Sequence, residues 1–440
     1  MKKLVLSIAL LSLLGFNTQA SALICTVDDV PASTLLLPYF EVDLTNANGV
    51  TTLFSVNNAS ATAVLAHVVV WSDLSVPVLD FNIYLTGYDV QTINLRDIFV
   101  TGALPRTASA GQDPTDTISP HGLFSQDINF ASCTGQLPPP PLPASFIAHL
   151  QASLTGKSSA ILGNRCAGQA LGDNVARGYV TVDTVNNCTL RFPGDAGYFP
   201  AGVGDATNQN VLWGDYAYVN PGENFAQGET LVHIESAPGT GANQFSGNYA
   251  ASPEIAVGEY TFYGRYVTWN GSDNREPLGT NYGARFVNGG AFSGGTSFVC
   301  WRDSKTNQGP FTCPALAGVR PPWFPLGQEQ IVIFDEVENP EVPTTLPVSP
   351  QPPNQQNLLC PAEAQRTRID GASFPVTPDF GWIYANLNTT IVGNPNPPED
   401  PAAAQAWIET VMDAQGRFSI GYDAIQFDSA CNANHALIGN

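Results

Sequence analysis

Charged residues are scarce in this sequence, and lysine is the scarcest of them. Asp, Glu, Lys and Arg together make up 12% of the 440 residues, about half their usual share. Beyond the N-terminal Lys2 and Lys3, the only lysines are Lys157 and Lys305. Long solvent-exposed helices need Lys, Glu and Arg on their outer faces, so this composition argues against a mainly helical protein.

Positive charge is in shortest supply. The chain has 17 Lys and Arg residues against 38 Asp and Glu residues, which gives a formal net charge of −21. Proteins that bind DNA or RNA through its phosphates present a basic surface. We therefore expect no nucleic-acid partner, and we expect anionic membrane surfaces to repel the chain.

Catalytic signatures are lacking as well. The sequence contains no G-x-S-x-G elbow, no H-E-x-x-H metal motif and no C-x-x-C-H haem site. Gly156-Lys157-Ser158 matches the end of a phosphate-binding loop, but Gln151 stands where that motif requires glycine. We assign no catalytic residue and no organic cofactor, and we favour a non-enzymatic role while leaving enzymatic activity open.

The one prolonged apolar run lies at the N-terminus. Lys2 and Lys3 precede the run 4–15, and Ala20-Ser21-Ala22 follows it, which is the plan of a signal peptide. The run is shorter than the ~20 residues that a membrane-spanning helix needs, and no later segment offers a span. We predict a signal peptide over 1–22 and export to the periplasm, the cell surface or the exterior. A lipid-modified Cys25 is an alternative, although the bulky Ile24 disfavours it.

An even number of cysteines in an exported chain favours disulfides over metal ligation. The eight are Cys25, Cys133, Cys166, Cys188, Cys300, Cys313, Cys360 and Cys431. Pairing each cysteine within one predicted domain joins Cys300 to Cys313, Cys166 to Cys188, Cys360 to Cys431 and Cys25 to Cys133.

The abundant residues indicate strands joined by turns. Gly and Pro number 40 and 35, and 43% of residues are hydrophobic. Short runs at 53–57, 79–85 and 90–95 alternate, and 63–71 is apolar on both faces, as in a β-sandwich. Phe54-x-Val56-x-Asn58 resembles the opening of immunoglobulin-like domains. The predicted fold is mostly β, with immunoglobulin-like or β-sandwich modules and few short helices.

The rest of the chain continues this pattern. Further strands are predicted at 178–182, 211–219, 230–235, 260–269, 282–287, 297–301 and 330–334, and a hairpin with a short helical lead-in at 400–422. One helix is predicted over 146–154, closed by Gly156. Proline-rich linkers at 137–143 and 338–357 separate a sandwich domain (23–136), a central β-rich domain (144–337) and a C-terminal β-rich segment (358–440).

Two groups of residues are candidate sites. Aromatic residues beside acids can bind sugars, which singles out Trp213, Asp215, Tyr216 and Glu229, with Arg265, Arg275, Glu276 and Arg285 nearby in the chain. Oxygen-rich turns suit Ca²⁺, which singles out Asp183, Asp195, Asp205 and Asp273. The plainer interpretations are core packing and ion pairs for the first group, and ordinary turn formation for the second.

Histidines offer little further chemistry. His67 lies in the most apolar run, where a buried neutral imidazole bonded to the backbone is expected. His233 and Glu235 share one side of a predicted strand and could form an acid/base or metal pair, with a surface ion pair as the simpler alternative.

Together these patterns predict an exported non-enzymatic β-sandwich protein that binds or assembles at the cell surface or in the periplasm. A polysaccharide or a protein is the expected partner. The alternative is a secreted carbohydrate-active hydrolase that uses a pair of carboxylates on a β scaffold.

Overall fold

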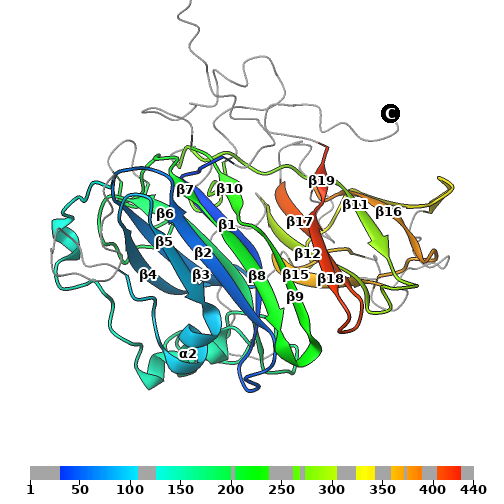
Figure 1. The fold of residues 1–440 in the computed structure, drawn as a ribbon, viewed down its shortest axis with the longest axis horizontal. Helices are drawn as coiled ribbons and strands as arrows, with labels where there is room; N and C mark the ends of the chain where they lie inside the picture. The colour runs from blue at the N-terminus through cyan, green and yellow to red at the C-terminus, as the bar shows by residue number, and fades with distance from the viewer. Residues whose placement is uncertain are drawn as a thin grey trace, which may run out of the picture.

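Four antiparallel sheets make up two packed β-sandwiches (Figure 1). The computed structural model describes residues 30–107, 125–199, 204–236, 261–267, 273–304, 324–341, 358–370, 374–388 and 404–427. The predicted mostly β class with few short helices is confirmed, whereas immunoglobulin-like topology stays a prediction. The predicted signal peptide lies outside the described residues.

The first sandwich contains the β1–β6 sheet and the β2–β8 sheet. The β1–β6 sheet has the order β10 (Val232–Ile234), β1 (Thr34–Asp43), β6 (Val175–Val185), β3 (Val64–Ser72) and β4 (Pro77–Leu85). The β2–β8 sheet has the order β5 (Val90–Asn94), β2 (Thr51–Asn58), β8 (Asp215–Asn220) and β9 (Phe225–Thr230), and β7 (Leu212–Trp213) also pairs with β2.

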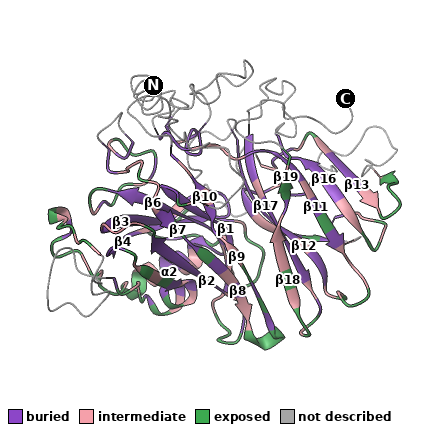
Figure 2. Ribbon diagram, turned by 45° about the horizontal axis from the view of Figure 1, so that its top comes forward, coloured by how far each residue is buried: buried purple, intermediate pink, exposed green. Residues whose placement is uncertain are grey.

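Burial in this sandwich follows the apolar pattern of the sequence. All nine residues of β3 are buried, as the run apolar on both faces predicts. Figure 2 shows β1, β3 and β6 mostly as buried strands. The predicted helix is α2 (Ala144–Ser153), which contacts β4 and the short π-helix η1 (Asp97–Thr101). The remaining helical turns are η2 (Ala131–Cys133) and η3 (Pro221–Glu223).

The second sandwich contains the β12–β17 sheet and the β11–β16 sheet. The former has the order β15 (Ala364–Ile369), β12 (Gly295–Ser304), β17 (Ala404–Asp413) and β18 (Ser419–Asp423). The latter has the order β14 (Pro340–Glu341), β13 (Gln330–Asp335), β16 (Phe380–Asn386), β11 (Asn281–Val287) and β19 (Ile425–Gln426). The predicted C-terminal hairpin is β17 and β18, and strand rather than helix is already present at Ala404.

The β12–β17 sheet is covered on both faces. On one face, Phe298 and Ile408 belong to the core between the two sheets of the second sandwich. On the other face, Val299, Trp301 and Val411 belong to the core of the first sandwich. Contacts of β12 with β1 and of β15 with β6 bring the two sandwiches together. None of the helices among the described residues is long and apolar enough to cross a membrane.

Strand pairing does not follow the predicted domain boundaries. β6 lies after the proline-rich segment 137–143, yet it pairs with β1 and β3 before it. Likewise β15, after 338–357, pairs with β12 before that segment. Independent folding of the three predicted domains stays a prediction. Strands from before and after each predicted linker nevertheless pair within one sheet.

The strand predicted at 260–269 is wrong over its described part. Residues 261–267 form consecutive turns, in which the backbone N–H of Tyr266 and that of Val267 both donate to the carbonyl oxygen of Tyr263. Phe262 and Tyr263 are buried. The apolar positions of this segment therefore fill a gap between the sandwiches instead of extending a sheet, and period-two alternation cannot distinguish these outcomes.

The disulfides join different cysteines from those paired by proximity in sequence. Cys133 bonds to Cys188 with Cα atoms 5.1 Å apart, and Cys300 bonds to Cys360 with Cα atoms 6.3 Å apart. All four predicted pairings are therefore wrong, because the fold brings together cysteines that lie 55 and 60 residues apart. Cys166 is also disulfide-bonded, whereas Cys25, Cys313 and Cys431 lie outside the described residues.

Peptide mapping under non-reducing conditions should recover Cys133 linked to Cys188 and Cys300 linked to Cys360. Each link restricts the unfolded chain, so reduction and alkylation should lower the free energy of unfolding by roughly 4 kcal/mol per link, measured as a lower urea midpoint. Recovery of Cys300 linked to Cys313 instead would contradict this arrangement.

Candidate functional site

A row of three side chains crosses the outward face of the β11–β16 sheet. Arg285 of β11 stands opposite Trp382 of β16, and Trp382 stands opposite Phe334 of β13. Neighbouring residues alternate between faces, so Phe286, Ile333 and Ile383 point into the core of the second sandwich while the row points away from it.

Aromatic side chains lie on this outward face of the β11–β16 sheet. The rings of Trp382 and Phe334 stack with centroids 4.4 Å apart and planes 11° apart. Phe380 and Phe427 are 42% and 40% exposed. Gly283 lets Phe427 lie across β11, because a Cβ there would stand 2.6 Å from the Cζ atom of Phe427. The result is a partly exposed aromatic surface on a sheet.

Polar groups border the aromatic surface on two sides, giving a groove of about 450 Å³ that we call the outer groove. It is lined by Arg285, Asp335, Glu338, Phe380, Trp382 and Phe427, among others. Arg285 is exposed and has no ion pair within the described part of the chain. Glu336 and Glu338 are exposed on the turn after β13.

Asp335, at the edge of the outer groove, stabilises the turn after β13. Its carboxylate accepts hydrogen bonds from the backbone N–H of Val337 at 2.9 Å, from the backbone N–H of Asn339 at 2.8 Å and from the side-chain amide of Asn339 at 2.9 Å. The Asn339 side-chain bond is the largest cause that lowers the pKa of Asp335. Asp335 therefore shapes the turn as an anion.

The sugar-binding residues proposed from sequence do not form one site. Trp213, 42% exposed, and Asp215 point outward from β7 and β8. Tyr216 is buried and stands opposite Glu229 on the other face. Of the wider group, Arg285 alone lines the outer groove. Trp382 and Phe380 were not predicted as site residues, although the alternation of residues 380–386 is typical of a strand that places both on one face.

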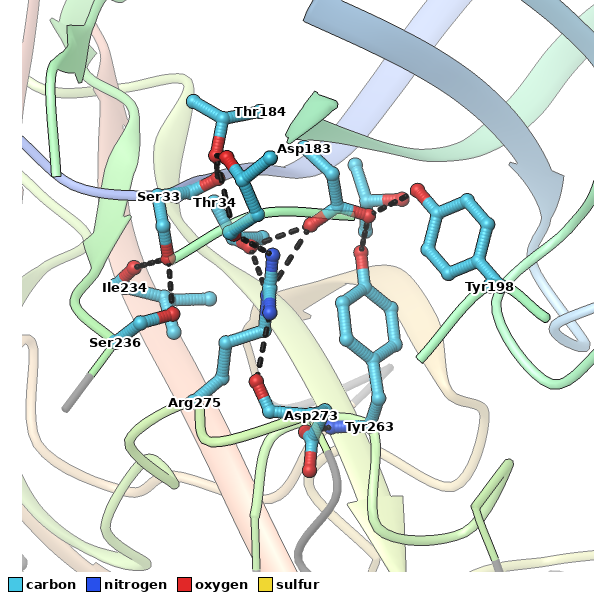
Figure 3. A network of polar contacts seen from close by, with 12 residues as sticks. Ser33, Thr34, Asp183, Thr184, Tyr198, Ile234, Ser236, Tyr263, Asp273 and Arg275 are labelled. Atoms are coloured by element: carbon cyan, nitrogen blue, oxygen red, sulfur yellow. Dashed lines mark hydrogen bonds and ion pairs between the residues drawn. The ribbon is translucent and has the colours of Figure 1, made fainter. Parts of the chain in front are cut away.

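Asp183, proposed as a calcium ligand, instead lies in a buried polar network (Figure 3). Its carboxylate accepts hydrogen bonds from the hydroxyls of Tyr198 at 2.7 Å and Tyr263 at 2.9 Å. The Nε of Arg275 lies 3.3 Å from it and donates to the hydroxyl of Thr34 at 2.6 Å. Both charged side chains are fully buried. A guanidinium therefore occupies the position next to Asp183 that a cation would need.

The other proposed calcium ligands have separate tasks. Asp205 pairs with Arg191 at 2.8 Å, Asp195 accepts the backbone N–H of Phe192 at 2.8 Å, and Asp273 accepts that of Tyr263 at 2.7 Å. Burial raises the pKa of Asp273 to about 6. Within the ranges that the structure describes, no three His, Cys, Asp or Glu residues are grouped as metal ligands would be.

The histidines contact neighbouring polar groups. His67 is fully buried, as predicted, but its Nδ1 bonds the side-chain oxygen of Asn82 at 3.0 Å instead of the backbone. His233 contacts the carbonyl oxygen of Val30 through Nδ1 at 2.9 Å and accepts the N–H of Gly214 at 3.3 Å. These contacts hold the ring of His233 against the backbone.

A second cavity, of about 230 Å³, lies between the sandwiches, and we call it the inter-sandwich cleft. Side chains of Glu41, Asp73, Arg177, Arg366 and Arg368 line it. The buried carboxylate of Asp73 accepts two hydrogen bonds at 3.0 Å from the backbone and side-chain amides of Gln169. Burial raises the pKa of Asp73 to about 7.

The β12–β17 sheet contacts the first sandwich through the buried carboxylate of Glu409. The hydroxyl of Tyr216 donates to Oε2 of Glu409 at 2.6 Å, and the amide of Gln227 donates to Oε1. Glu409 is fully buried, and burial raises its pKa to about 7. This carboxyl group is held by partners from β8 and β9 but carries a large desolvation cost when ionised.

Comparison with models of protein families found no match to the chain, and comparisons with curated proteins and with solved structures found none either. Functional inference therefore depends on the geometry described above.

Asp183→Asn should destabilise the protein strongly. The substitution removes the anion beside Arg275 and leaves a buried guanidinium without its charge partner, which costs about 3 kcal/mol or more. Urea unfolding followed by tryptophan fluorescence measures the loss. Asp173→Asn is the control. It breaks an ion pair with Arg177 in which the carboxylate is 45% exposed, so water can solvate the remaining charge and the loss should be clearly smaller than for Asp183→Asn. Equal losses for the two variants would argue against a special role for the buried network.

Glu409→Gln should gain stability relative to the wild type as pH rises. The folded-state pKa of Glu409, about 7, lies above the value of about 4.3 expected for an unfolded chain. The contribution of Glu409 to the free energy of unfolding is thus fully present below pH ~4 and is lost as pH rises through ~7. The loss is at most about 3 kcal/mol. Gln does not titrate, so the difference between variant and wild type should shift by up to that amount between pH 4 and pH 8.

Urea unfolding at pH 4, 6 and 8 measures this difference. Glu223→Gln removes an exposed carboxylate on η3 and serves as the control, with a difference from wild type that stays nearly constant. A Glu409→Gln difference that is equally constant across these pH values would show that Glu409 is not a buried acid.

Proposed function

We propose that this protein is an exported, non-enzymatic β-sandwich protein that binds a neutral oligosaccharide in the outer groove. The observation that carries the proposal is the cross-strand row of Arg285, Trp382 and Phe334 on the outward face of the β11–β16 sheet. Export is supported by the two disulfides among the described residues, since disulfides persist in oxidising compartments.

The groove offers both kinds of contact that a sugar ring needs. Partly exposed aromatic rings provide flat apolar surface against which the C–H face of a pyranose can stack. Arg285 can only donate hydrogen bonds, whereas the carboxylates of Glu336 and Glu338 can only accept them. A sugar hydroxyl does both, so donors on one side and acceptors on the other suit a neutral polyol.

Charge argues against an acidic polysaccharide in the groove. Asp335, Glu336 and Glu338 outnumber Arg285 at its border, and the whole chain carries a net charge of −21. A polyanion would be repelled at long range. A neutral glycan experiences no such repulsion and gains from both stacking and hydrogen bonding.

The carboxylates of the outer groove favour binding over the alternative, hydrolysis. A glycosidase of the common kind needs one carboxylic acid whose pKa is raised, so that it can protonate the leaving group. Asp335 has a lowered pKa and is engaged in its own turn. Glu336 and Glu338 lie on the same turn as Asp335, so the acids that line the groove all stand on one side of it and do not flank a bound glycosidic bond as a catalytic pair would.

Trp382→Ala should weaken oligosaccharide binding by tenfold or more, because it removes the stacking surface at the centre of the groove, a loss of about 2 kcal/mol. Isothermal titration of the full chain with cellohexaose and with maltohexaose measures the affinity. Trp213→Ala is the control, since Trp213 is a tryptophan on the other sandwich that is more exposed than the half-buried Trp382, and this variant should bind as the wild type does.

Absence of saturable binding to either neutral oligosaccharide, or loss of binding in Trp213→Ala but not in Trp382→Ala, would overturn the proposal. New reducing ends in the titrated mixture would support the hydrolase alternative instead.

A further inference from the structure

Three arginines meet in the inter-sandwich cleft although the chain is poor in positive charge. Arg177 belongs to β6 of the first sandwich, and Arg366 and Arg368 belong to β15 of the second. They represent three of the 17 basic residues in a chain with a net charge of −21. Their convergence on a cavity of about 230 Å³ requires an explanation.

Arg177 is fully committed to protein partners. Its Nη1 and Nη2 donate to the two carboxylate oxygens of Asp173, each at 2.8 Å, and its Nε lies 3.8 Å from Glu41. This bidentate pairing holds the guanidinium in one orientation at the wall of the cleft. Arg177 therefore supplies fixed positive charge but few remaining donors.

Arg366 and Arg368 keep donors in reserve. They are alternate residues of β15 and so project from the same face. Arg366 uses Nη1 on Glu41 at 3.1 Å, and Arg368 uses Nε on Asp370 at 2.7 Å. Within the described part of the chain, their other N–H groups have no acceptor. The side chain of Arg368 is 52% exposed, so it does not serve to neutralise a buried carboxylate as Arg265 and Arg275 do.

We propose that the inter-sandwich cleft binds a small oxyanion, a carboxylate or sulfate group, through the remaining N–H donors of Arg366 and Arg368. A planar guanidinium fork matches the spacing of two oxygens on one such group. The cavity, at about 230 Å³, is smaller than the pockets of about 300 Å³ and above that hold drug-sized ligands, which suits a ligand no larger than a single sugar acid. This site is separate from the outer groove and does not depend on the function proposed for it.

The neighbouring groups restrict what the cleft accepts. Glu41 occupies the space between Arg177 and Arg366 and repels any anion that approaches there. Ser297 stands opposite Arg368 on the adjoining strand β12 and also lines the cleft. The oxyanion therefore belongs on the Arg368 side, where the hydroxyl of Ser297 adds a donor and, among the described residues, Asp370 is the one carboxylate that contacts the guanidinium.

The test is isothermal titration of the full oxidised chain with sodium D-glucuronate, with sodium sulfate and with D-glucose, at constant ionic strength and in the Trp382→Ala background to silence the outer groove. Saturable binding of glucuronate or sulfate, without binding of glucose, is expected. Tighter binding of glucuronate identifies the carboxylate of an organic ligand, whereas tighter binding of sulfate identifies an inorganic oxyanion.

Arg368→Gln should weaken oxyanion binding about tenfold and leave the urea midpoint unchanged, which a merely structural arginine would not do. Arg366→Lys retains the charge beside Glu41 but removes the fork, and should weaken binding to a similar degree. Arg285→Gln, in the outer groove, should have no effect. The proposal is overturned if neither anion binds saturably, or if Arg368→Gln and Arg366→Lys both bind as tightly as the wild type.

Discussion

The fold depends on burying both faces of the β12–β17 sheet. One face closes the second sandwich, and the other packs Val299, Trp301 and Val411 into the core of the first. A sheet with two buried faces can no longer leave its polar side chains in water, so each must find a partner. Glu409 therefore meets Tyr216 and Gln227, and the cost of its ionisation appears as a raised pKa.

The segment 261–267 fills the remaining space between the sandwiches. Tyr263 reaches the first sandwich, where its hydroxyl bonds Asp183, and Arg265 reaches the second, where it pairs with Asp303 at 2.9 Å and with Glu363. Phe262 stacks on Trp301 with ring centroids 5.2 Å apart. With the inner faces occupied in this way, the outward face of the β11–β16 sheet stays open to solvent, and Phe380 and Phe427 are exposed there.

Patterns within short stretches of sequence correctly predicted a strand, a hairpin and a helix. The two-faced apolar run at 63–71, the hairpin around Gly416 and the helix after Pro143 all form as expected. β1 was missed because Pro38 and a register shift between Leu37 and Phe40 interrupt its alternation. Local patterns could not predict partners that lie far apart in the chain. The row of Arg285, Trp382 and Phe334 joins three strands, and Cys133–Cys188 and Cys300–Cys360 each span more than 50 residues.

The few arginines explain how an acidic surface coexists with a stable interior. Arg265 and Arg275 neutralise buried carboxylates, and Arg302 donates to the carbonyl oxygens of Cys360, Gly327 and Leu387, with burial lowering its pKa to about 9. The buried arginines are balanced by the buried carboxylates Asp183, Asp303 and Glu363. The excess of acids in the chain therefore lies at the surface. A neutral ligand suits that surface, and an anion can approach only where the chain places arginines together, as it does in the inter-sandwich cleft.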